Sequence, residues 1–163
     1  MKNNEELLNQ FYAYLLTEKR VAENTFLAYQ RDISQLMTHF QARKISVHDC
    51  EKKDLTAFLR KQKNAGFSAK TLARKVSSIK LFFSYLSERF GVLNCARSLL
   101  FPKLEKKLPS YLSEREVYSL LETANRNTSP KGIRNKVMLY LLYASGMRVS
   151  ELISITHDQL HFD

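Results

Sequence analysis

A long amphipathic pattern between Ser68 and Gly91 constrains the fold more than any other part of the sequence. Apolar residues recur there at alternating steps of four and three, which is the spacing of one face of an α-helix. Ser68 is a typical N-cap residue, and Gly91 accepts the left-handed conformation that ends many helices. The pattern predicts one helix whose buried stripe consists of Leu72, Val76, Ile79, Phe83, Leu86 and Phe90.

Shorter patterns of the same kind predict three earlier helices. They cover about residues 5–17, 24–40 and 51–64, with Asn24 as an N-cap and Gly66 as the end of the third helix. A short fifth helix is expected over residues 94–100. Residues 101–109 then hold two prolines, four charged side chains and no periodicity, which is typical of an extended linker.

The rest of the chain is also predicted to be helical. Ser113 and Glu116 form a capping-box pattern that begins a helix reaching about residue 125. Residues 137–144 are apolar on every helical face, so a helix that begins at residue 131 or 132 is expected to be buried on all sides. Since no stretch of this chain alternates like a strand, the predicted fold class is all-α.

The distribution of charge indicates a polyanionic partner. The formal net charge is +10, and residues 52–107 carry 14 basic and 3 acidic side chains, whereas residues 109–163 are neutral overall. Such a local excess is typical of a protein that binds nucleic acid. A solvated face rich in lysine and arginine is the alternative interpretation.

Cations and short hydroxyl side chains lie beside the apolar stripes of the second and fourth predicted helices. This mixture suits the phosphates and the major groove of duplex DNA. The predicted DNA contacts on these helices are Asn24, Thr25, Gln30, Arg31, Ser34, Lys70, Thr71, Arg74, Lys75 and Ser78. Lys103, Lys106 and Lys107 extend this set into the linker.

A second candidate site is Arg148. The apolar run before it ends at Gly146 and helical spacing resumes at Val149, so Arg148 is expected in a corner between two helices. A guanidinium there can donate a two-pronged hydrogen bond to a phosphate and keeps its charge at neutral pH. Glu151 follows three residues later, so a simple helix-capping pair of Arg148 and Glu151 is the alternative.

Other kinds of site find no support in the sequence. Neither a glycine-rich phosphate loop nor a metal-type cluster is found, so no nucleotide, metal or other cofactor is expected. Cys50 and Cys95 lack metal-ligand spacing and are expected to be reduced, partly buried thiols, and the sequence assigns them no function. No apolar run approaches the roughly 18–20 residues of a membrane span, and no signal-peptide core is found, which favours a cytoplasmic protein that does not bind membranes.

The run Tyr-Ala-Ser-Gly-Met-Arg-Val-Ser-Glu-Leu at residues 143–152 resembles the first arginine box of the tyrosine recombinases, the phage-integrase family. The resemblance is greatest to the Xer branch, and within it to the XerD type. Residues 23–25 with Tyr29 and Asp32, residues 101–104 and residues 108–109 are also similar to that branch. This resemblance implies that Arg148 is a catalytic residue that binds the scissile phosphate, and that Glu151 supports it.

The resemblance also implies a domain organisation and a reaction. It implies a SAM-like core-binding domain over residues 1–101, a linker over 102–112, and the first helices of a catalytic domain over 113–163. The reaction would be site-specific breakage and rejoining of DNA through a phosphotyrosine, with resolution of chromosome dimers as the favoured role. The implied partners are double-stranded DNA and a second recombinase protomer bound to it, without a cofactor.

Parts of the family's catalytic machinery are not found after Arg148. No tyrosine and no His-x-x-Arg box follow it, so the chain is expected to stop inside the catalytic domain and to be inactive by itself. Tyr143 is interpreted as a core or interface aromatic residue. Because the elements that cover the helix over residues 133–144 in the family are also not found, part of its apolar surface is expected to be exposed in this chain. The alternatives are a phage or transposon integrase of the same family, a non-catalytic helical DNA-binding regulator, and a basic helical scaffold for an acidic protein.

Overall fold

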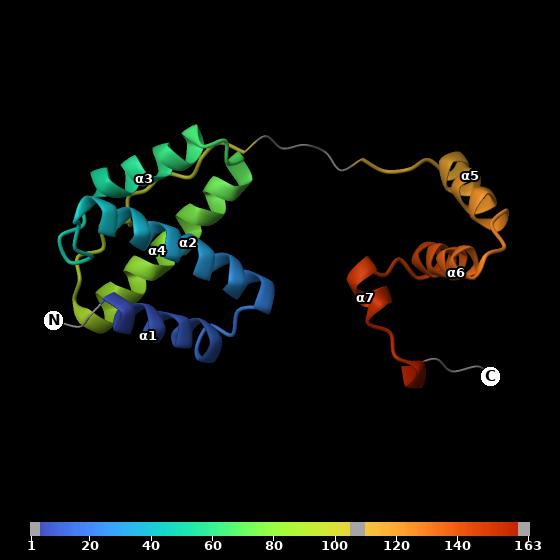
Figure 1. Cartoon of the computed structure of the whole chain (residues 1–163), viewed down its shortest axis with the longest axis horizontal. Helices are drawn as coiled ribbons and strands as arrows, with labels where there is room; N and C mark the ends of the chain where they lie inside the picture. Colours follow the sequence, from blue (N-terminus) through green and yellow to red (C-terminus); the bar gives the residue numbers. More distant parts are fainter. Residues whose placement is uncertain (1–3, 105–109, 160–163) are drawn as a thin grey trace. The chain divides into compact units, whose positions relative to one another are not determined.

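The computed structural model describes residues 4–104 and 110–159, and the chain divides into two compact units, residues 1–106 and residues 107–163. Figure 1 shows that the regular elements of the described ranges are all helices. The prediction of an all-α fold is therefore confirmed. None of the described helices is long and apolar enough to cross a membrane.

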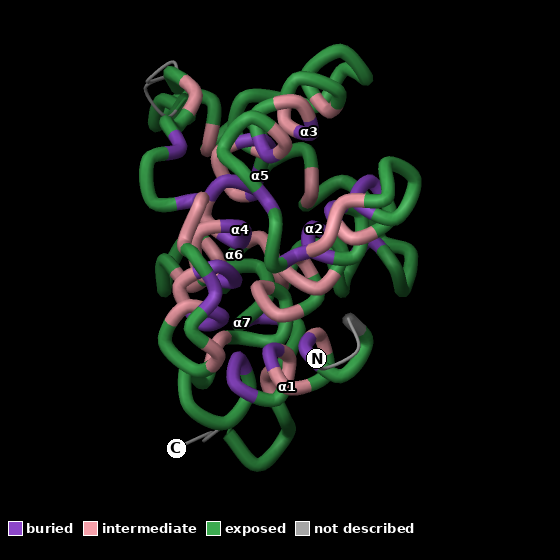
Figure 2. The backbone as a smooth tube through the Cα atoms, turned by 90° about the vertical axis from the view of Figure 1, so that its left-hand side faces the viewer, coloured by how far each residue is buried: buried purple, intermediate pink, exposed green. Residues whose placement is uncertain are grey.

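Four helices form the first unit: α1 (Asn4–Thr17), α2 (Glu23–Arg43), α3 (Lys52–Asn64) and α4 (Ala69–Phe90). α4 packs against both α2 and α3, and α1 packs against α2. Figure 2 colours the buried positions of these helices purple. In the core, Phe11 of α1 meets Phe82 of α4 edge to face, with ring centroids 5.0 Å apart. Each such buried side chain contributes about 1.5–3 kcal/mol, so the apolar stripes supply the main stabilisation of this unit.

The boundaries and the buried stripe of α4 agree with its sequence pattern. Ser68 Oγ accepts the backbone N–H of Thr71 at 3.2 Å, and Gly91 ends the helix with a φ of +67°. Of the six predicted stripe residues, all are buried except Phe90, which is half-buried against the core. The predicted helix, its two caps and its stripe are therefore confirmed.

Of the predicted ends of α2 and α3, one is wrong and one is confirmed. Asn24 is not the N-cap of α2, because the Ala22 carbonyl accepts the first helical hydrogen bonds and the helix begins at Glu23. Asn24 instead lies in the first turn of the helix. The predicted end of α3 is confirmed, because Gly66 follows the C-cap with a φ of +87° and its N–H bonds to the Lys63 carbonyl at 3.0 Å.

The helix expected over residues 94–100 is a series of turns. The Arg97 N–H bonds to the Asn94 carbonyl at 3.4 Å and the Leu99 N–H bonds to the Ala96 carbonyl at 3.1 Å, so these bonds close over three residues rather than four. Ala96 and Leu99 are buried in the core. Packing of these side chains therefore holds the segment in place, and the described part of the first unit has four helices rather than five.

The second unit contains α5 (Glu114–Asn125), α6 (Pro130–Ser145), α7 (Val149–Ile153) and a 3₁₀ turn, η1 (His157–Gln159). The predicted capping box of α5 is confirmed, because the Glu116 carboxylate accepts the Ser113 N–H at 2.7 Å while Ser113 Oγ accepts the Glu116 N–H at 3.4 Å. α6 begins slightly earlier than predicted. Ser129 Oγ caps it by accepting the Gly132 N–H at 3.1 Å, which leaves Pro130 in the first helical position.

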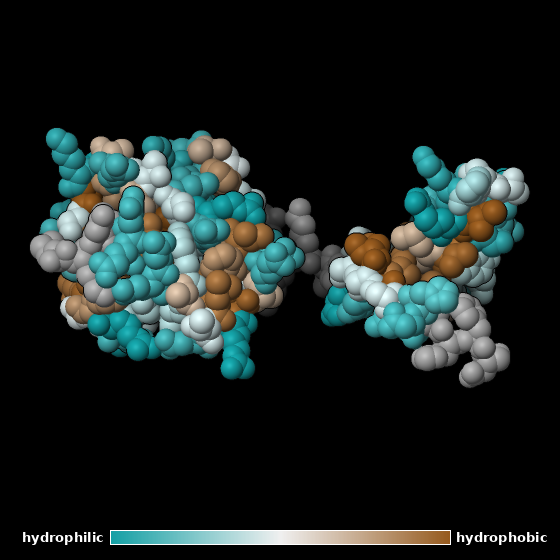
Figure 3. All heavy atoms as spheres, turned by 60° about the horizontal axis from the view of Figure 1, so that its bottom comes forward, coloured by the Kyte–Doolittle hydropathy of each residue, from teal (hydrophilic) through white to brown (hydrophobic). Residues whose placement is uncertain are grey.

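α6 is not buried on all sides in this unit, so the expectation that part of its apolar surface is exposed is confirmed. Ile133, Val137, Tyr140 and Tyr143 are between 41% and 55% exposed, since α5 and α7, which pack against α6, cover only part of its surface. Figure 3 shows apolar side chains, in brown, on the surface of this unit. Tyr143 is thus not a core residue here, and an exposed apolar surface of this kind is typical of an interface.

Candidate nucleic-acid interface

The first turn of α4 contains no acidic side chain. Lys70 in this turn is exposed, and Thr71 is half-buried with its Oγ1 3.0 Å from Ser68 Oγ. A helix N-terminus carries a partial positive charge, so a lysine there is unfavourable in isolation and becomes favourable when an anion binds. This end of α4 is therefore suited to contact a phosphate backbone.

A buried carboxylate joins α2 to α4. Asp32 of α2 is 1% exposed, and its oxygens accept hydrogen bonds from Arg74, from Lys75 Nζ at 3.0 Å and from Ser78 Oγ at 3.4 Å. Lys75 Nζ also donates to Gln35 of α2. These five residues, Asp32, Gln35, Arg74, Lys75 and Ser78, are called the Asp32 cluster below.

The Asp32 cluster fixes the position of Arg74 at the surface. Buried charges are tolerated in proteins when they are paired and hydrogen-bonded, and Asp32 meets both conditions. Arg74 Nη1 additionally donates to the Ala28 carbonyl of α2 at 3.0 Å, while 38% of the Arg74 side chain stays exposed. The Arg74 guanidinium is thus held between α2 and α4 with part of it open to a ligand.

Two of the predicted DNA contacts are buried in this cluster. Lys75 is 1% exposed, Ser78 is fully buried, and Lys75 Nζ lies 5.2 Å from the ring centroid of Phe67. The prediction that Lys75 and Ser78 lie on the exposed face of α4 is therefore wrong. Both side chains point into the contact between the helices because both bond to Asp32.

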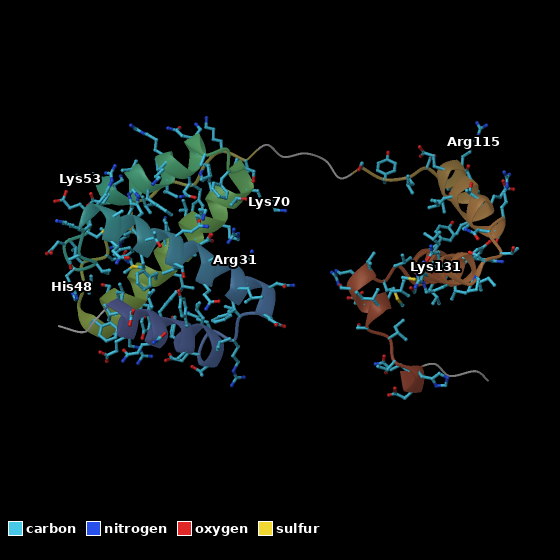
Figure 4. The ribbon with its side chains drawn as sticks, viewed as in Figure 1. Arg31, His48, Lys53, Lys70, Arg115 and Lys131 are labelled. Carbon is cyan, nitrogen blue, oxygen red and sulfur yellow. The ribbon has the colours of Figure 1, made fainter. Side chains whose placement is uncertain are left out.

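The other predicted DNA contacts that the structure describes lie at or near the surface. Asn24, Arg31, Ser34, Lys70 and Lys103 are exposed, and Thr25, Gln30, Thr71 and Arg74 are half-buried. Lys106 and Lys107 lie outside the described residues. In Figure 4, Arg31 and Lys70 lie toward the same end of the first unit, whereas Lys53 lies toward the opposite end. The candidate interface is therefore the α2–α4 face around Arg74.

Sequence reasoning gave no role in the site to Asp32 or Gln35. Asp32 positions Arg74 and Lys75 from α2, and Gln35 positions Lys75. A signal for Asp32 did exist, because it lies three residues after Tyr29 and four before Leu36 and so shares their helix face. An acidic residue on an apolar face needs a buried partner, and α4 carries two cations at the matching position.

Arg148 lies in the predicted corner between α6 and α7. Gly146 ends α6 with a φ of +65°, and Arg148 is the N-cap of α7. The Arg148 backbone N–H donates to one oxygen of the Glu151 carboxylate at 2.6 Å, and Arg148 Nη1 donates to the other at 2.9 Å. The expected capping pair is therefore formed.

The capping pair leaves most of the Arg148 guanidinium open. Its side chain is 82% exposed, and within the described ranges no acceptor is bonded to its Nε or Nη2. The backbone hydrogen bond from Arg148 lowers the pKa of Glu151 most, and the side-chain hydrogen bond lowers it further. The Glu151 carboxylate therefore stays charged at neutral pH. A charged Glu151 can orient Arg148 while the remaining N–H groups bind a phosphate.

Comparison with known proteins gives matches along nearly the whole chain. Residues 8–89 match the family model described as "Phage integrase, N-terminal SAM-like domain", and residues 110–163 match the model described as "Phage integrase family". The α2–α4 face lies in the first match, and Arg148 lies in the second.

Individual proteins also match. Tyrosine recombinase XerC of Herpetosiphon aurantiacus is 37% identical over 93% of this chain and 50% of its own length. Tyrosine recombinase XerD of Haemophilus influenzae is 35% identical over 96% of this chain and 53% of its own length. Tyrosine recombinase XerD of Rickettsia conorii is 35% identical over 90% of this chain and 48% of its own length. The chain thus spans about half the length of these relatives.

Proposed function

Because the chain belongs to the phage integrase family, we propose that it is part of a tyrosine recombinase that breaks and rejoins duplex DNA at a specific site. The observation that carries this proposal is the open guanidinium of Arg148 in the corner between α6 and α7, paired on one side with Glu151. The similarity to proteins named tyrosine recombinases XerC and XerD supports it.

Arg148 is the proposed catalytic residue of this chain. Cleavage of a phosphodiester passes through a phosphorus centre with extra negative charge, which positioned cations stabilise. The planar fork of an arginine matches two oxygens of that centre, and Glu151 holds the fork from behind through Nη1. We assign Glu151 a positioning role, because its carboxylate contacts Arg148 rather than presenting a proton to the phosphate.

The first unit is the proposed DNA-binding part. We propose residues 1–101 as a core-binding domain, 102–112 as a linker and 113–163 as the beginning of a catalytic domain. The exposed cations Arg31, Lys70 and Lys103 would contact phosphates. The half-buried Arg74, which is held between α2 and α4, would contact the DNA with its exposed part. A second protomer on the same DNA is part of the proposal, as is a cytoplasmic location.

The proposed biological role is resolution of chromosome dimers. The matched relatives include both XerC and XerD proteins, which favours this branch of the family. Integration of phage or transposon DNA would use the same chemistry and remains the alternative role.

Replacing Lys70 with glutamine is expected to weaken binding of the 163-residue chain to duplex DNA. If Lys70 contacts one phosphate, its loss removes about one released counterion, so the slope of log affinity against log salt becomes shallower by about 0.9. Fluorescence anisotropy over a salt series measures this slope. The expected affinity loss is largest at low salt.

Lys53→Gln is the matched control for this experiment. Lys53 is also an exposed helical lysine, but it pairs with Glu51 at 2.9 Å and lies toward the opposite end of the unit (Figure 4). Its replacement should leave the slope unchanged. Equal losses from the two replacements would mean that the α2–α4 face is not the DNA-binding surface.

A further inference from the structure

Two cysteines that are 45 residues apart in the sequence meet in the first unit. Cys50 directly precedes the N-cap of α3, and Cys95 lies in the turns after α4. Their Sγ atoms are 3.4 Å apart, within hydrogen-bond distance. Neither thiol has a part in the proposed DNA binding or cleavage.

The surroundings of the two thiols differ in a way that assigns them different tasks. Cys95 is half-buried and therefore more accessible than Cys50, which is 3% exposed. The contact with Cys50 is the largest cause that lowers the pKa of Cys95, and the contact with Cys95 raises the pKa of Cys50. Its greater exposure, together with the lowered pKa, makes Cys95 the thiol that meets an oxidant first.

We propose that Cys50 and Cys95 form an oxidisable dithiol that a peroxide converts into an intramolecular disulfide. The Cys95 thiolate attacks one peroxide oxygen, the O–O bond breaks, and Cys95 becomes a sulfenic acid while the hydroxide takes up a proton to form water. Cys50 then attacks the Cys95 sulfur, loses its proton, and displaces hydroxide, which leaves as a second water. Two thiols and one peroxide thus yield one disulfide and two waters.

The backbone around both cysteines is irregular, which favours this closure. A disulfide requires the sulfurs to approach to about 2.05 Å, and neither cysteine lies within a regular helix that would resist a small shift. Cys95 belongs to the series of turns over residues 94–98, and Cys50 lies in the connection between α2 and α3. In a reducing compartment such a bond would form only while an oxidant is present.

The disulfide would link the two walls of a groove. A groove of about 610 Å³ lies between α3, the beginning of α4 and residues 99–102, and its lining includes Lys52, Leu59, Leu99 and Phe101. Lys52 follows Cys50 by two residues, and Leu99 follows Cys95 by four. Closing the bond would therefore fix the segment that leads out of α4 against the start of α3.

The test is peroxide titration of the reduced 163-residue chain. We expect the number of free thiols to fall from two to none, the mass to fall by two hydrogen atoms, and a peptide that links Cys50 to Cys95 to appear after digestion. Cleavage by trypsin after Lys103 should become slower, and the thermal midpoint should rise, when the bond closes. Addition of dithiothreitol should reverse all five changes.

Single replacements separate the proposed tasks. Cys50→Ser should let Cys95 stop at a sulfenic acid that dimedone labels, whereas Cys95→Ser should leave a Cys50 thiol that peroxide oxidises slowly. Circular dichroism checks that both variants keep their helices. Two thiols that survive excess peroxide, or a disulfide found only between separate chains, would overturn the proposal.

Discussion

Replacing Asp32 with alanine is expected to destabilise the first unit by about 3–5 kcal/mol, because it leaves the buried Lys75 without a counter-charge. Lys75 is 1% exposed and donates to Asp32 at 3.0 Å, so it cannot turn to water without opening the contact between α2 and α4. Native-state hydrogen exchange of the α2 and α4 amides measures this loss in the unit concerned. Asp32→Ala should also weaken DNA binding, since Arg74 loses the carboxylate that holds it.

Two further variants test whether the effect comes from the buried charge. Asp49 is an exposed aspartate of the same unit, so Asp49→Ala should change the free energy of unfolding by no more than about 0.5 kcal/mol. The double replacement Asp32→Leu with Lys75→Met removes both buried partners and should recover most of the stability lost in Asp32→Ala. A stability of Asp32→Ala equal to that of Asp49→Ala would contradict the role of the Asp32 cluster.

Replacing Arg148 with alanine is expected to lower the rate of DNA cleavage by on the order of 10² to 10³, the typical cost of one missing donor in such a site. The assay needs a protein in which this chain is joined to the half of a relative that the chain does not match. Single-turnover cleavage of a labelled duplex then gives the rate. Affinity for the duplex should hardly change, because the proposed binding cations lie in the first unit. Arg148→Lys keeps the charge but loses the planar fork, so its cleavage rate should lie between that of the unchanged protein and that of Arg148→Ala.

Arg115→Ala is the control for Arg148→Ala. Arg115 is an exposed arginine of α5 in the same unit and is labelled in Figure 4. Arg115 lies in α5, whereas Arg148 lies between α6 and α7. Replacement of Arg115 should therefore leave the cleavage rate unchanged. Cleavage by Arg148→Ala at the rate of the Arg115→Ala control would remove the catalytic assignment.

Helices and their caps could be predicted from the sequence because they depend on near neighbours. Ser68 and Ser113 each bond to a backbone N–H three residues later, and Gly146 adopts a conformation that glycine favours by itself. For the same reason the corner around Arg148 could be predicted. The N-cap of α2 was predicted wrongly, because Ala22 begins this helix with its backbone carbonyl and has no capping side chain that a sequence pattern could show.

The buried position of Lys75 could not be predicted in this way. Lys75 lies three residues after Leu72 and four before Ile79, at the edge of the buried stripe, where a lysine is usually exposed. What buries it is Asp32, 43 residues away on another helix. The periodicity of one helix contains no information about which residue of a second helix it meets.

The exposure of α6 has a related cause. Its apolar faces correctly predicted a helix that tends toward burial, but hydropathy does not say which elements cover it. Among the described residues α5 and α7 cover part of it, and Val137 and Tyr143 stay more than half exposed. Likewise, the contact between Cys50 and Cys95 depends on the way α3 and the end of α4 come together, which spacing in the sequence does not reveal.

Covalent trapping on a nicked duplex tests most directly whether this chain belongs to a DNA-cleaving recombinase. Duplexes are first selected from a random pool by binding to the 163-residue chain, and a nick near the cleaved bond then prevents rejoining. We expect the protein that joins this chain to the remaining half to form a tyrosine-linked adduct, and its Arg148→Ala variant to bind the duplex but form almost none. Equal adducts from both proteins would contradict the role of Arg148, and selective binding without any adduct would indicate a non-catalytic DNA-binding regulator.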